Sequence, residues 1–205
     1  MPDISQPFSF DTYKAFSYDS SLYPSDNPDD ADVTNPKSIP CQYYTNENIE
    51  THEPNISNCN LSLFHQNIQS LNKHSNDLVN YLSSLKHHFD IYGFSETWFN
   101  CDTDANIIDL GEYSSESCVR KDRRGGGVTL FIKSSLNYIN RHDLVFNCID
   151  CDSLFVEITL NSSKVIIGIV YKPEYVVFND FHAQLGAVLN KISSEKKLRL
   201  KSPIM

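Results

Sequence analysis

The sequence has no long apolar segment, and this absence limits what the protein can be. Its longest apolar run lies around Val165–Tyr171, far short of the about 18 residues that a membrane helix needs. The first ten residues, MPDISQPFSF, have neither the basic start nor the apolar stretch of a secretory leader. We therefore expect an intracellular protein, nuclear or cytoplasmic, with no membrane partner.

The sequence also lacks the cysteine spacings that are typical of a zinc site. Only one pair forms a CxxC motif, and no second pair has the spacing of a four-ligand zinc site. Without a secretory signal we interpret the cysteines as reduced thiols. Their positions are Cys41, Cys59, Cys101, Cys118, Cys148 and Cys151.

Basic residues are scarce in the first part of the chain. The formal net charge is −9, and residues 1–58 hold ten acidic residues against two lysines. Residues 59–205 hold sixteen acidic and fifteen basic residues, so the overall acidity does not argue against a polyanionic substrate for this part. Residues 1–57 are rich in Asp, Asn, Ser, Pro and Tyr and have no apolar periodicity, which predicts a disordered extension. Its Phe and Tyr residues leave open a short docking motif.

The pattern changes near Asn60. LSLFHQN reads as a strand, and Leu78, Leu82, Leu85 and Phe89 form one helical stripe. DIYGF then reads as a buried strand, so strand, helix and strand predict a crossover unit with two parallel strands. Ser75 or Asn76 is the predicted helix cap. Glu96 follows the second strand, at the carboxyl edge where ligands often bind.

The second half predicts one strand, a hairpin and a helix. VTLFIK reads as a strand after a glycine triplet, and SLFVEITL and KVIIGIVY are joined as a hairpin by a short polar loop. A helix follows, starting at Asn179 or Asp180. Its predicted apolar face consists of Phe181, Leu185, Val188, Leu189 and Ile192.

Five motifs in this order resemble one family. NIQSLNK, IYGFSETW, RRGGGVTLFIK, SLFVEI and IIGIVYKP are similar to the endonuclease/exonuclease/phosphatase superfamily, in particular to the apurinic-like endonuclease domain of LINE-type non-LTR retrotransposons. The likeness covers about residues 60–197, roughly the first half to two-thirds of such a domain. It implies an α+β fold, a two-layer β-sandwich with flanking helices that is here C-terminally truncated. We expect residues 58–197 to form this partial domain and residues 198–205 to be a non-matching tail.

The resemblance also implies the chemistry of a site. Its activity is phosphodiester hydrolysis assisted by Mg²⁺ or Mn²⁺, which nicks DNA to prime reverse transcription, and it needs no small-molecule cofactor. Glu96 matches the metal-binding glutamate, a residue type that suits Mg²⁺ because this ion prefers carboxylate oxygen. Asn67 matches the asparagine beside the metal and the scissile phosphate, and Tyr171 matches a tyrosine that contacts the phosphate. Lower-ranked phosphate or nucleic-acid contacts are Gln69, Arg123, Arg124 and Lys172.

The departures from the family pattern matter as much as the matches. The Gly-Asp-Phe-Asn and Ser-Asp-His motifs, which supply further acidic residues and the catalytic histidine, do not occur in the sequence. We therefore expect weak or lost Mg²⁺ binding, little activity, and a sandwich with an exposed apolar face and open strand edges. Two alternatives remain: a non-catalytic module that binds nucleic acid or protein, and a retroelement remnant without function.

Overall fold

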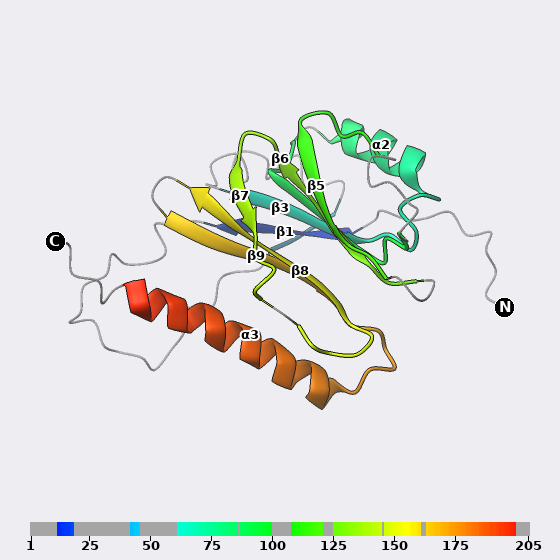
Figure 1. The fold of residues 1–205 in the computed structure, drawn as a ribbon. Helices are drawn as coiled ribbons and strands as arrows, with labels where there is room; N and C mark the ends of the chain where they lie inside the picture. Colours follow the sequence, from blue (N-terminus) through cyan, green and yellow to red (C-terminus); the bar gives the residue numbers. More distant parts are fainter. Residues whose placement is uncertain are drawn as a thin grey trace.

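The computed structural model places two β-sheets against each other, with a helix on the outer side of each (Figure 1). The fold is therefore α+β with two stacked sheets, as the sequence predicted at this level. The structure describes residues 61–85, 87–99, 108–120, 125–144, 146–160 and 163–199, together with the strands at 12–18 and 42–45.

The larger sheet has six strands in the order β2-β1-β3-β4-β6-β5. Its strands β3 and β4 are parallel, and Asn67 pairs with Ser95 at their carboxyl ends. The predicted crossover unit is thus confirmed. The bounds are Thr12–Tyr18 for β1, Gln42–Thr45 for β2, Leu61–Asn67 for β3, Ile91–Ser95 for β4, Tyr113–Cys118 for β5 and Val128–Lys133 for β6.

The smaller sheet has the order β7-β8-β9. Strands β8 and β9 form the predicted hairpin, in which Asp152 pairs with Tyr171 at one end and Leu160 with Ser163 at the other. Among the described residues, β9 is an edge strand of this sheet. The bounds are Asn137–Asn140 for β7, Asp152–Leu160 for β8 and Ser163–Tyr171 for β9.

Three apolar clusters hold the layers together. The first lies under helix α2 (Ser75–Ser84) and is rich in aromatic rings, including Phe64, Phe89 and Phe94. The second lies between the sheets, where Ile91 and Val156 are fully buried. The third packs helix α3 (Phe178–Arg199) on the outer face of the small sheet. The expected exposed apolar face is therefore wrong for the inner faces of the sheets, because each covers the other.

Several local expectations need correction. Helix α2 begins at Ser75, with His74 at the N-cap and no side-chain cap bond, whereas the sequence predicted Ser75 or Asn76 as cap. Ser75 Oγ instead donates to the Asn72 carbonyl at 3.1 Å. The helix ends at Ser84, so Phe89 enters the core from the connection that follows it. In α3, Leu189 is exposed although the periodicity placed it on the apolar face.

Part of the extension that we expected to be disordered forms strands. β1 pairs antiparallel with β3, and β2 pairs with β1. Both segments contain Tyr or Phe residues that favour strands, and β1 lies along the edge of β3 that β4 leaves open. The expectation of disorder therefore fails for 12–18 and 42–45, and the rest of 1–57 lies outside the described residues.

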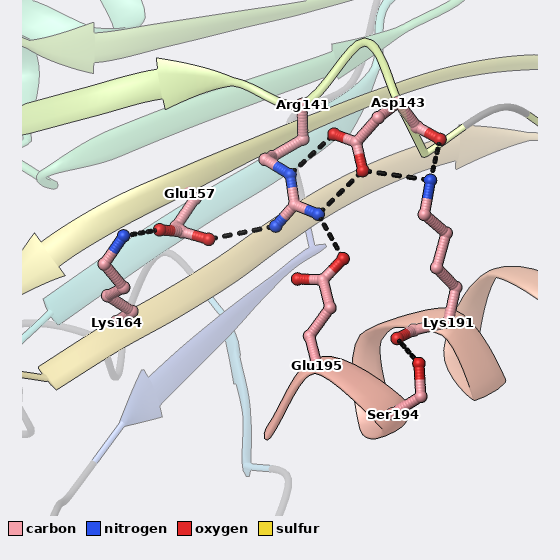
Figure 2. A network of polar contacts seen from close by, with 7 residues as sticks. All are labelled: Arg141, Asp143, Glu157, Lys164, Lys191, Ser194 and Glu195. Carbon is pink, nitrogen blue, oxygen red and sulfur yellow. Dashed lines mark hydrogen bonds and ion pairs between the residues drawn. The ribbon is translucent and has the colours of Figure 1, made fainter. Parts of the chain in front are cut away.

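A network of charged side chains ties α3 to the small sheet; we call it the helix tether (Figure 2). Arg141 donates to Asp143 at 2.7 Å, to Glu157 on β8 at 2.9 Å and to Glu195 on α3 at 2.6 Å. Lys164 on β9 also pairs with Glu157, and Lys191 on α3 pairs with Asp143. Arg141 and Glu157 are both buried, so the network neutralises charges that would be costly alone.

Candidate functional site

The candidate site lies where strands β3 and β4 end. The parallel pairing brings the two following loops together, and backbone bonds join them: the Ser70 amide donates to the Glu96 carbonyl at 2.8 Å, and the Leu71 amide donates to the Thr97 carbonyl at 3.0 Å. Such an edge collects side chains that are far apart in sequence.

Asn67 and Glu96 are in direct contact. Asn67 Nδ2 donates to Glu96 Oε1 at 2.8 Å, across 29 positions of sequence. Asn67 is exposed and Glu96 is partly exposed, so the carboxylate is open to solvent and ligands. The sequence placed these two residues at neighbouring strand ends, and the structure brings them together.

Tyr171 reaches the same carboxylate from the other sheet. It ends β9, and its hydroxyl lies close enough to Glu96 for this carboxylate to shift its pKa. Burial, and then the interaction with Glu96, raise the pKa of Tyr171 to about 12, so the phenol is neutral and can donate near neutral pH. Asn67, Glu96 and Tyr171 thus form one cluster from three strands and two sheets.

The backbone around the cluster is strained. Gln69, Ser70, Glu96 and Trp98 have φ values of 46°, 91°, 54° and 56°. Among the described residues that are not glycine, only Asp150 also has positive φ, at 72°. Non-glycine residues rarely adopt this conformation, and such strain concentrates at functional sites.

The glycine triplet supports the Glu96 loop. The carbonyls of Gly126 and Gly127 accept from the amides of Trp98 and Thr97 at 2.9 and 3.3 Å. Gly127 has φ 81°, and a Cβ there would lie 2.7 Å from Thr97 Oγ1. The glycines therefore allow close backbone approach.

One ion pair beside the cluster was not found from the sequence. Arg120 donates to Asp152 through Nε at 2.8 Å and through a terminal nitrogen at 2.6 Å, and the Gly127 amide donates to the same carboxylate at 2.9 Å. The guanidinium also bonds the Asp150 carbonyl and lies 5.9 Å from the centre of the Tyr171 ring. In the sequence, the only indication of this ion pair was Asp152, an aspartate at the start of an apolar strand.

The remaining predicted contacts are less favourably placed. Lys172 Nζ donates to the carbonyls of Pro173 and Val176 at 3.0 and 3.2 Å, so it binds its own loop in this structure. Gln69 is exposed beside the cluster. Arg123 and Arg124 lie outside the described residues.

The donor set allows only a sparsely ligated cation. Within the described ranges, no three His, Cys, Asp or Glu side chains are grouped to hold a metal ion. Mg²⁺, however, usually keeps several waters and needs one or two carboxylates together with substrate phosphate. Glu96, with Asn67 beside it, fits that minimal arrangement. Asp152 is not a free second ligand, because Arg120 and Gly127 already bond its carboxylate.

Comparison with known proteins does not extend this description. A scan against models of protein families finds no match, and a search of curated proteins finds no matching sequence. Across the described segments no helix is long and apolar enough to cross a membrane. The interpretation of the site therefore depends on the motifs and the geometry.

Proposed function

We propose that this chain is derived from the endonuclease domain of a LINE-type retrotransposon, within the endonuclease/exonuclease/phosphatase superfamily. In this proposal the cluster of Asn67, Glu96 and Tyr171 binds Mg²⁺ or Mn²⁺ together with a DNA phosphate. Sustained cleavage by this chain alone is not expected. The observation that supports the proposal is the convergence of these three residues at strand ends, beside loops that contain positive-φ residues.

The cluster has complementary chemistry for a metal-bound phosphate. Glu96 offers a hard anionic oxygen for the cation, whereas the Asn67 amide and the Tyr171 hydroxyl supply neutral donors for phosphate oxygens. In this structure the Asn67 amide donates to the Glu96 carboxylate, and the Tyr171 hydroxyl lies near it. A bound cation would supply Lewis-acid stabilisation of the phosphate.

The missing groups explain why we expect weak activity. The sequence holds neither the Gly-Asp-Phe-Asn nor the Ser-Asp-His motif, and Asp152 is occupied by Arg120. General acid–base help is typically worth about 10²–10⁴-fold in rate. A site without its general base should therefore still bind DNA phosphate but cleave DNA only slowly.

A nicking assay tests the catalytic part of the proposal. Supercoiled plasmid is incubated with the chain and Mg²⁺ or Mn²⁺, beside Glu96→Ala and the exposed control Glu112→Gln. We expect no more nicking by the parent chain than by Glu96→Ala. Robust nicking that Glu96→Ala abolishes would show that the proposed inactivity is wrong but the site is right.

Cation binding is measured separately. Mn²⁺ broadens amide resonances near its site, so we expect selective broadening around Asn67 and Glu96 in the parent chain and in Glu112→Gln. Glu96→Gln should remove it. Broadening that is the same in Glu96→Gln, or absent from this loop, would overturn the metal site.

DNA binding is the third readout. Contacts with phosphates release counterions, so affinity should fall as salt is raised. The test is the affinity for duplex DNA at several salt concentrations. Failure to bind DNA at low salt would contradict the nucleic-acid part of the proposal.

A further inference from the structure

The CxxC motif lies at a tight turn before β8. Cys151 Sγ is 3.0 Å from Cys148 Sγ, and the Cys151 amide donates to the Cys148 carbonyl at 3.2 Å. Both cysteines are free thiols. Cys148 is 8% exposed and Cys151 is partly exposed, whereas Ile149 between them is 85% exposed. The turn therefore lies at the surface with its two thiols facing each other.

The same turn carries the acceptors of Arg120. The Asp150 carbonyl and the Asp152 carboxylate, on either side of Cys151, both accept from the Arg120 guanidinium. Asp150 has a positive φ of 72°, which is unfavourable for a residue with a side chain. The thiol pair and the candidate site are thus connected through a strained turn.

We propose that Cys148 and Cys151 form a reversible intrachain disulfide by exchange with small-molecule disulfides, at the turn that holds Arg120. A disulfide bond is about 2.0 Å long. The sulfur atoms therefore need to approach by only about 1 Å, which side-chain rotation can supply. The proposal is independent of the phosphodiesterase assignment.

The exchange balances without another reactant. The more exposed Cys151 loses its proton to solvent, and its thiolate attacks one sulfur of the small-molecule disulfide, releasing one small thiolate. Cys148 then loses its proton and attacks the Cys151 sulfur of the mixed disulfide, releasing the second thiolate. The protein loses two protons and two electrons, and the small-molecule disulfide is reduced to two thiols.

The exchange should be slow. Burial, and then the hydrogen bond to Cys148, raise the pKa of Cys151 to about 12. The reactive thiolate is therefore scarce near neutral pH. The test has to be an equilibrium measurement and not a rate.

The experiment equilibrates the folded full-length chain with mixtures of oxidised and reduced glutathione, then quenches, alkylates and digests it. Mass spectrometry should show that the peptide containing Cys148 and Cys151 loses two hydrogens. Cys151→Ser should leave Cys148 free or linked to glutathione. The isolated Cys118 thiol is an internal control because it has no described partner thiol.

The same glutathione equilibration is repeated in denaturant. It measures how readily this CxxC forms a disulfide in the unfolded chain, so the difference from the folded chain is the contribution of the fold. We expect the equilibrium constant for the disulfide to be at least about tenfold larger in the folded chain. Equal constants, free thiols at equilibrium, or glutathione on both cysteines would overturn the proposal.

Trp98 gives the readout for the connection to the site. It is the single tryptophan of the chain, and its amide bonds Gly126, next to the Gly127 that binds Asp152. We expect oxidation to change its fluorescence in the parent chain and not in the Cys148→Ser/Cys151→Ser variant. Identical spectra of the oxidised and reduced parent chain would overturn this connection.

Discussion

The helix tether and the candidate site both contain charged side chains, but the carboxylates in the two regions have different kinds of partner. In the tether, Arg141 bonds three carboxylates, and lysines complete the neutralisation. In the site, the Glu96 carboxylate accepts from the Asn67 amide and lies near the Tyr171 phenol. Glu96 also has positive φ, whereas no tether residue does. A charge cluster alone therefore does not mark a site. We propose that the mark is a carboxylate that has no cationic partner among the described residues and lies on strained backbone.

The strongest test of this comparison removes the centre of the tether. Arg141→Ala takes one cationic partner from the buried Glu157 and breaks the link to Glu195. We expect a loss of about 3–5 kcal/mol in the free energy of unfolding, measured by urea denaturation. The exposed Lys191→Ala should cost less than about 1 kcal/mol. A similar small loss for Arg141→Ala would show that the tether does not stabilise the fold.

The second test addresses the ion pair next to the site. Arg120→Ala leaves Asp152, which is 6% exposed, with the Gly127 amide as its described remaining donor. We expect a loss of about 2–3 kcal/mol in unfolding free energy. The double variant Arg120→Ala/Asp152→Ala should lose less than the sum of the single changes. Additive losses would contradict the direct pairing.

The third test asks whether the site stores strain. Glu96→Gly removes the side chain from a position with φ 54°, where glycine is favoured, so we expect a gain of about 0.5–1 kcal/mol in stability. Glu112→Gly, at a residue without positive φ, should instead reduce stability. If Glu96→Gly were clearly destabilising, the contacts of Glu96 would matter more to the fold than its strain, and the contrast with the tether would fail.

The smallest effect concerns pH. Hydrogen bonding to Arg141, and further to Lys191, holds the pKa of Asp143 well below its ordinary value of 3.8. A depressed folded-state pKa contributes stability above the unfolded pKa, and this contribution is lost as pH falls below it. The free energy difference between the parent chain and Asp143→Asn should therefore shrink between pH 5 and pH 3. A difference that is constant over this range would exclude the linkage.

Local patterns predicted much of the fold. The parallel pair β3 and β4 and the β8–β9 hairpin followed from apolar periodicity and from the short loops that connect these elements. The proximity of Asn67 and Glu96 followed as well, because parallel strands end at one edge. The strand β1 was missed because its surroundings are rich in Asp, Asn and Pro, and only the edge of β3 provides its partner.

Contacts between distant segments could not be predicted in this way. Arg120 and Asp152 are 32 positions apart, and Arg141 and Glu195 are 54 positions apart. Neither pair belongs to a periodic pattern or a motif that we used. Their pairing depends on how the sheets and α3 pack, which no local spacing specifies.

The sequence by itself determined the strands β3, β4, β6, β8 and β9, the two helices and the strand end at which Glu96 lies, because hydrophobic periodicity and chain geometry act over a few residues. Only the tertiary structure decided that Tyr171 from the second sheet meets this carboxylate, and that Arg120 and the CxxC turn lie next to it. Burial of apolar faces brings the sheets together without regard to sequence distance. Which polar groups meet at their rim is therefore a result of packing.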